Sequence, residues 1–151
     1  MTMRNLPQAP SSRSLPLLGL MASALLVGLG CGDGRPTRVP ISGTLTIDGK
    51  PLMFGSVLFV PPAGRPAGGA LDANGRYELS CDEKGDGTML GEYKVAVTGV
   101  ESLGEHAQRW HAPQKYRDAQ TSGLTATVEG PRDDLNFEIT WDGGKPFVEK
   151  F

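Results

Sequence analysis

The residues best suited to chemistry are two histidines in one segment, residues 99–122. Glu105 precedes His106, and His111 follows five residues later. Imidazole and carboxylate groups are common zinc ligands, but paired ligands on one helix face are four residues apart and no cysteine joins this set. The spacing therefore predicts no metal site. An enzyme that used the segment would need the fold to bring the two histidines together with a carboxylate.

The same segment contains residue types that often anchor binding interfaces. It spans 24 residues without a clear pattern, which is typical of a crossover on the surface, with at most one helical turn around 102–109 and with Trp110 and Tyr116 packed on the body. Tryptophan, tyrosine and arginine carry much of the binding energy at protein interfaces. If aromatic rings formed an exposed strip, they would suit a glycan instead. The candidate binding residues are Arg109, Trp110 and Tyr116 in the segment and Trp141 beyond it.

A second cluster of polar residues lies in the acidic segment 82–87, which contains Asp82, Glu83 and Asp86 among glycines. Calcium prefers such oxygens, but the order of residues differs from that of a calcium-binding loop. We interpret the segment as an acidic, solvated turn.

Other catalytic and nucleic-acid signatures are missing from the sequence. It has no G-x-S-x-G nucleophile motif, no phosphate-binding glycine loop before a helix, and no basic run with interleaved aromatic residues. The 15 basic and 17 acidic residues give a formal net charge of −2, which offers no electrostatic argument for nucleic-acid binding. These observations predict a protein that is not an enzyme and has no cofactor.

The beginning of the chain has the pattern of a secretory signal peptide, which we assign to residues 1–30. Arg4 and Arg13 are the only charged residues before Cys31, and the stretch from Leu15 to Gly30 is apolar apart from Ser23. A basic region, an apolar region and then small residues are typical of such peptides, and an apolar run of this length is short for a membrane-spanning helix.

The end of the apolar run, Leu25-Leu26-Val27-Gly28-Leu29-Gly30-Cys31, resembles the lipobox of bacterial lipoproteins. Gly28 stands where that family usually has leucine. The resemblance implies cleavage before Cys31, attachment of lipid to Cys31, and anchoring to a membrane on its periplasmic side or at the cell surface. Residues 31–38 would then be the lipidated cysteine and a polar tether.

The body of the chain alternates apolar and polar residues with a period of two, which is typical of half-buried antiparallel strands. The turn sequences Asp48-Gly49 and Asn74-Gly75 separate two pairs of these strands. Because a single sheet would leave its apolar face in water, we expect two packed sheets, with Cys81 as a small buried residue. Residues 143–151 are expected to form a flexible tail. The seven predicted strands cover residues 41–48, 56–60, 67–71, 76–81, 92–98, 124–129 and 135–142.

Several segments together resemble carboxypeptidase regulatory-like domains, which are transthyretin-like. They are ISGTLTIDGKPL from residue 41, GSVLFVP from 55, DANGRYEL from 72, LGEYKVAV from 90, PQKY from 113, TSGLTATV from 121 and LNFEI from 135. The resemblance implies a seven-stranded Greek-key β-sandwich of the prealbumin-like type over residues 39–142, without a catalytic role.

These observations lead us to expect an exported, lipid-anchored and non-catalytic β-sandwich with a binding or structural role in the cell envelope. Its partners would be the membrane, through the lipid anchor, and an envelope protein or a glycan, but no nucleic acid. A carbohydrate-binding module is the alternative, and an envelope enzyme that uses residues 99–122 is a third reading.

Overall fold

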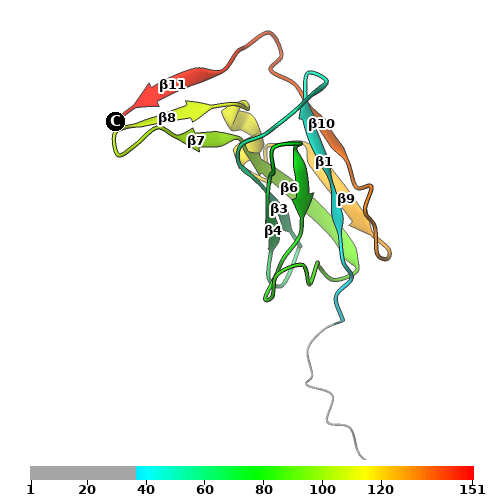
Figure 1. Cartoon of the computed structure of the whole chain (residues 1–151). Coiled ribbons are helices and arrows are strands. Elements are labelled where there is room, and N and C mark those ends of the chain that lie inside the picture. The colour runs from blue at the N-terminus through cyan, green and yellow to red at the C-terminus, as the bar shows by residue number, and fades with distance from the viewer. Residues whose placement is uncertain (1–36) are drawn as a thin grey trace, which may run out of the picture. The chain divides into compact units, whose positions relative to one another are not determined.

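A computed structural model describes residues 37–151 of the chain (Figure 1). The expected signal peptide, Gly28 and the lipidation residue Cys31 lie outside the described residues. Within the described part, the structure is all-β apart from one short 3₁₀ helix, which confirms that the fold is all-β as predicted. No helix in residues 37–151 has the length and apolar character needed to cross a bilayer.

One sheet contains four antiparallel strands in the order β4-β3-β6-β9. Val57 of β3 pairs with Val97 of β6, and Val95 of β6 pairs with Leu124 of β9. These β-branched and leucine side chains fit the pleated surface of a sheet. The strands are β3 (Ser56–Val60), β4 (Ala67–Ala70), β6 (Gly91–Thr98) and β9 (Leu124–Val128).

A second sheet is built around one strand, β1. β1 pairs with β10 in parallel, with Leu45 opposite Phe137, and pairs antiparallel with both β2 and β5. The backbone of Gly43 lies against Leu135, whose carbonyl oxygen would be 2.1 Å from an added Cβ. Glycine therefore permits β1 and the approach to β10 to lie this close. The strands are β1 (Ser42–Ile47), β2 (Lys50–Pro51), β5 (Arg76–Glu78) and β10 (Phe137–Ile139).

An aromatic cluster fills the core to which these strands contribute. Phe59 is fully buried, and its ring centroid lies 6.2 Å from that of Tyr77, 5.8 Å from Tyr93 and 5.9 Å from Phe137. Tilted and edge-on ring pairs at such distances are favourable. The polar ends of the rings are satisfied as well: the Tyr77 hydroxyl donates to the Leu135 carbonyl, and the Tyr93 hydroxyl donates to that of Met89. Burial of the Tyr77 hydroxyl raises its pKa above the ordinary value.

A third, three-stranded sheet differs from what the sequence predicted. Residues 99–122 are not an irregular crossover, because β7 (Val100–Ser102) and β8 (Ala107–Trp110) form a hairpin and Gln114–Arg117 form the 3₁₀ helix η1. Residues 147–150 are not a flexible tail either, because they form β11 (Phe147–Lys150) and pair with β8. Phe147 lies opposite Trp110, and their rings stack with centroids 6.2 Å apart.

Seven of the eleven described strands coincide with the seven predicted segments: β1, β3, β4, β5, β6, β9 and β10. The four additional strands, β2, β7, β8 and β11, are short. The last three pair with one another rather than with the seven.

Candidate functional site

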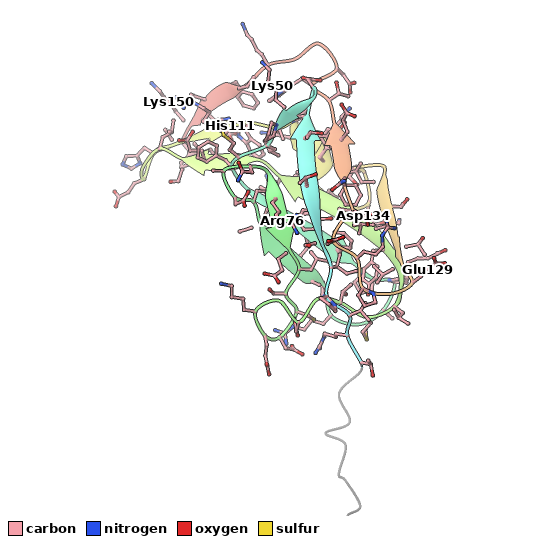
Figure 2. All side chains as sticks on the ribbon, turned by 45° about the vertical axis from the view of Figure 1, so that its right-hand side comes forward. Lys50, Arg76, His111, Glu129, Asp134 and Lys150 are labelled. Carbon is pink, nitrogen blue, oxygen red and sulfur yellow. The ribbon has the colours of Figure 1, made fainter. Side chains whose placement is uncertain are left out.

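A groove lies where the turn after β1, the residues after β2, the end of β8 and the residues after β10 meet. It has a volume of about 390 Å³, within the range of small-ligand pockets. Lys50 and His111 lie toward the same end of the molecule (Figure 2). We call this groove the aromatic groove. Its lining residues are Ile47, Asp48, Lys50, Pro51, Leu52, Met53, Phe54, His111, Trp141, Gly144, Lys145 and Pro146.

Two rings from distant parts of the chain form one wall of the aromatic groove. Phe54 stacks on the imidazole of His111, with ring centroids 4.7 Å apart and planes 21° from parallel. Gly55 places Phe54 there, since it has a φ of +116° and an added Cβ would lie 1.7 Å from the carbonyl oxygen of Thr98. Any other residue would displace the chain from the end of β6.

The imidazole of His111 is fixed by an acidic partner as well as by the Phe54 ring. Its Nε2 donates to Glu101 at 2.9 Å, and the same carboxylate accepts from Arg109 at 3.2 Å. The hydrogen bond from His111, followed by the charge and hydrogen bond of Arg109, lowers the pKa of Glu101 despite partial desolvation. These contacts hold the flat imidazole ring of His111 in a fixed position in the wall of the groove.

Charged groups without ion-pair partners in residues 37–151 stand at the rim of the aromatic groove. Lys50 and Lys145 carry two ammonium groups, and Asp48 carries one carboxylate. None of the three takes part in an ion pair within the described part of the chain, whereas the nearby Asp142 pairs with Lys115. Apolar rings bordered by free charges suit a ligand with a flat or apolar body and polar substituents.

The four candidate binding residues from the sequence differ in their burial and in their distance from the aromatic groove. Trp110 is 2% exposed and Tyr116 is 6% exposed, so neither presents an open ring face. The Trp110 indole donates to Glu149 at 2.8 Å, and the Arg117 guanidinium lies 6.0 Å from the ring centroid. Trp110 and Tyr116 therefore pack into the body, as expected for a crossover held by these two side chains, and do not form the alternative, an exposed contact surface. Of the four candidates, only Trp141 lines the aromatic groove, while Arg109 bonds to Glu101 beside it.

The two histidines do not form a joint site. His106 lies in the turn between β7 and β8, and His111 follows β8, so the four residues of β8 separate them by roughly 15 Å of extended backbone. Glu105 is exposed in the same turn as His106. No group of three or more histidine, cysteine or acidic side chains in residues 37–151 is arranged to hold a metal ion.

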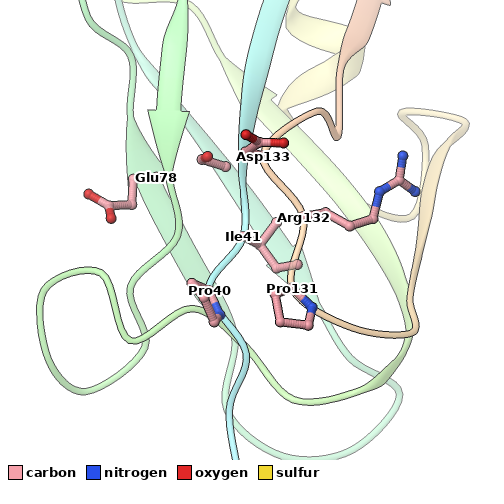
Figure 3. Close-up of a pocket in the computed structure, with 7 residues that line it drawn as sticks. Pro40, Ile41, Glu78, Pro131, Arg132 and Asp133 are labelled. Carbon is pink, nitrogen blue, oxygen red and sulfur yellow. The ribbon is translucent and has the colours of Figure 1, made fainter.

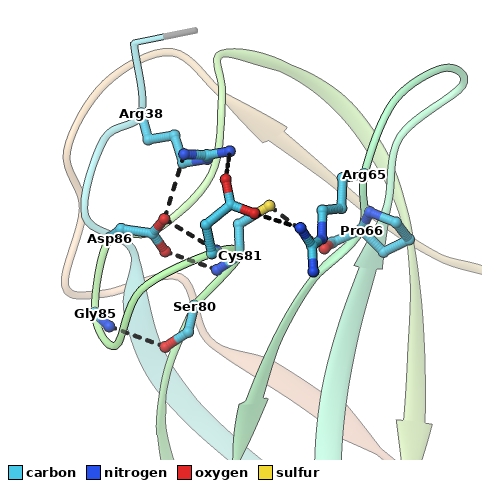
Figure 4. A network of polar contacts seen from close by, with 8 residues as sticks. Arg38, Arg65, Pro66, Ser80, Cys81, Gly85 and Asp86 are labelled. Carbon is cyan, nitrogen blue, oxygen red and sulfur yellow. Dashed lines mark hydrogen bonds and ion pairs between the residues drawn. The ribbon is translucent and has the colours of Figure 1, made fainter. Parts of the chain in front are cut away.

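The acidic segment 82–87 is tied down by arginines (Figure 4). Arg38 forms ion pairs with Asp82 and, at 3.4 Å, with Asp86, and Arg65 lies 2.5 Å from Asp82. Asp86 also accepts backbone hydrogen bonds from Cys81 at 2.7 Å and Asp82 at 3.1 Å. Desolvation opposes the charged form, but these hydrogen bonds and Arg38 outweigh it and lower the pKa of Asp86.

A shallower pocket of about 250 Å³ lies beside the beginning of β1 (Figure 3). Pro40, Ile41 and Pro131 line it, and the Arg132 guanidinium bonds to Asp134, which is not among the lining residues. Its polar groups do not converge on a common point, so it suggests no chemistry.

No protein-family model, curated protein or solved structure matches this chain. The aromatic groove was missed by sequence reasoning because Phe54, His111 and Trp141 are far apart in the chain. The Met53-Phe54-Gly55 run between a turn and a strand was the one local signal, since large apolar residues there have no place in the strand alternation.

Proposed function

We propose that this chain is an exported, lipid-anchored and non-catalytic β-sandwich of the carboxypeptidase regulatory-like type, with a binding role in the cell envelope. The observation that carries the proposal is the apolar run that stops at Gly30-Cys31 and is followed directly by a polar tether and a β-rich body. The seven strands that match the predicted segments support the seven-stranded Greek-key, prealbumin-like reading of that body.

The position of the aromatic groove supports a binding role for an anchored protein. A tether from Cys31 would enter the body at Arg38, which is bound to Asp82 and Asp86. β1 then carries the chain through six residues, roughly 17 Å of extended backbone, to the turn that borders the groove. An anchor at Cys31 would therefore attach at one end of β1, while the groove opens at the other.

Fatty-acid labelling in the producing cell tests the anchor. The unaltered chain should incorporate labelled fatty acid and fractionate with membranes, and Cys31→Ser should abolish the label. Cys81→Ser is the matched control and should keep it, because Cys81 is a partly buried residue of the body that contacts the Pro66 carbonyl. An unaltered chain that takes up no label and remains in the cytosol removes the proposal.

A carbohydrate ligand is a second candidate, favoured by the aromatic groove rather than by a strip of Trp110, Tyr116 and Trp141. Sugars stack their apolar faces on aromatic rings, and Trp141 and Phe54 border a concave surface of suitable volume with free charges at its rim.

A panel of envelope glycans tests this candidate with the full chain. Trp141→Ala should weaken glycan binding at least tenfold, whereas Leu90→Ala, which removes an exposed side chain outside the groove, should not. Glycan binding that is equal in both variants would exclude the groove, and an absence of binding to the whole panel would leave an envelope protein as the partner class.

A further inference from the structure

The strand β11 has a free edge. It pairs only with β8 in the described part of the chain, at one side of the three-stranded sheet (Figure 1). The backbone N–H of Phe151 donates to His106 of the same ladder, so Phe151, Glu149 and Phe147 are the residues whose backbone groups face β8. Hydrogen-bonding direction alternates along an antiparallel strand. The N–H and C=O groups of Val148 and Lys150 therefore point away from the sheet.

Apolar side chains gather along this same edge. Phe147 is 41% exposed, Val148 is 45% exposed and Phe151 is 69% exposed. Phe147 and Phe151 share one face of the strand and Val148 lies on the other, since successive side chains alternate. An edge with unpaired backbone groups and apolar residues on both faces is a template for pairing with another strand.

We propose that β11 pairs antiparallel with β11 of a second copy of this chain, with Glu149 opposite Glu149 as the centre of the pair. Val148 of each copy then lies opposite Lys150 of the other. In each of these two Val148–Lys150 pairs, both residues donate their outward N–H to the other's outward C=O, which gives four hydrogen bonds across the junction. The two three-stranded sheets become one sheet of six strands.

The register follows from symmetry and from the side chains. A twofold axis perpendicular to the sheet preserves its faces, so only residues whose numbers have the same parity can lie opposite each other. In the proposed register, Phe147 of one copy faces Phe151 of the other at both ends of the junction, and the stem of Lys150 covers Val148. Centring the pair on Val148 would place Lys150 opposite Pro146, which has no N–H to donate.

Repulsion between two carboxylates opposes the pairing and makes the association depend on the salt concentration. The two Glu149 carboxylates lie on the same face near the axis and repel each other. Each is held toward its own β8 by hydrogen bonds from Gln108 at 2.7 Å and Trp110 at 2.8 Å. Salt screens the repulsion between exposed charges. Association should therefore strengthen as the salt concentration rises.

Cysteine cross-linking tests the proposed register in the full chain with Cys31→Ser and Cys81→Ser, under mild oxidation. Residues opposite each other at the centre have Cα atoms about 4.5 Å apart, within disulfide range. Glu149→Cys should therefore form a covalent dimer. Val148→Cys alone and Lys150→Cys alone should not, because each lies roughly 8 Å from its own equivalent. A mixture of Val148→Cys with Lys150→Cys should cross-link, and this pair leaves Glu149 intact.

Proline supplies the control for backbone pairing. Val148→Pro removes an outward N–H without touching the ladder to β8, and edge strands tolerate proline in that orientation. Combined with Glu149→Cys, it should reduce cross-linking at least fivefold and leave the unfolding temperature of the reduced monomer within a few degrees. Equal cross-linking at positions 148, 149 and 150, no cross-linking in the mixed pair, or no effect of Val148→Pro would each overturn the proposal.

Discussion

The carboxylate of Glu149 on β11 accepts a hydrogen bond from the indole Nε1 of Trp110 on β8, at 2.8 Å. Gln108 donates to the same oxygen at 2.7 Å. One acidic side chain thus joins the last strand to the β7–β8 hairpin and satisfies the polar atom of a buried tryptophan. The hydrogen bond from Gln108, and then that from Trp110, lowers the pKa of Glu149.

This contact predicts an acid-sensitive signal from Trp110. Because the pKa of Glu149 is lowered in the folded state, its contribution to stability is present above the ordinary glutamate value of 4.5 and is lost as the pH falls through the lower, folded value. In a Trp141→Phe background, Trp110 fluorescence should change below pH 4.5. Glu149→Gln should remove that transition, while Glu92→Gln, which alters an exposed glutamate on another strand, should preserve it. An identical acid titration in all three proteins would contradict the assignment.

The close approach of β1 to Leu135 predicts a strict requirement for glycine at position 43. In Gly43→Ala, the new Cβ would lie 2.1 Å from a backbone oxygen that no side-chain rotation can move. We expect the free energy of unfolding to fall by about 2–3 kcal/mol, as in other overpacked cores. Gly130→Ala is the control, since an added Cβ there meets nothing within 4 Å. Denaturant unfolding measures both, and equal stabilities would disprove the constraint.

Phe59 and its neighbour Leu58 predict losses of stability of very different size on truncation. Phe59 is fully buried against three aromatic rings, whereas Leu58 points to the outer face of the same strand and is substantially exposed. Phe59→Ala should lower the free energy of unfolding by about 3–5 kcal/mol, since it removes a buried ring and leaves a cavity. Leu58→Ala should cost less than about 1 kcal/mol. Similar losses in thermal unfolding would place the core elsewhere.

The turn held by Asp86 predicts a smaller effect. Asp86→Ala leaves the N–H groups of Cys81 and Asp82 without their acceptor and removes a partner of Arg38. By analogy with the loss of a helix cap, we expect a cost of about 1 kcal/mol at neutral pH. The cost should be lost as the pH falls from the ordinary aspartate value of 3.8 through the lower pKa that Asp86 has in the folded state. Asp133→Ala, an exposed residue, should have no measurable effect at either pH.

The alternating strands were predictable because their signal is local. In β1, Leu45 and its neighbours two residues away face the core, and the turn residues Asp48-Gly49 follow directly. Gly43 also stood at an inward position of this pattern, although only its distance to Leu135 explains why it must be glycine.

The third sheet could not be predicted because its strands have no clear local pattern and form only by pairing with one another. Ala107–Trp110 does not alternate cleanly, and its partner Phe147–Lys150 lies about forty residues further along the chain. The packing of Trp110 on the body was predictable from its residue type, but the strand pairing that buries it was not. The aromatic groove was hidden for the same reason, since Phe54 and His111 meet only after β8 is in place.

The parallel pairing of β1 with β10 has a mechanical consequence. The chain enters β1 from Arg38 at one end of the strand pair and leaves β10 toward β11 at the other end. A pulling force applied between residues 37 and 147 therefore slides the two strands past each other in opposite directions. Their three paired positions, from Leu45 with Phe137 to Ile47 with Ile139, then bear the load together rather than in succession. A body stretched between its two ends would resist extension in shear instead of peeling open one bond at a time.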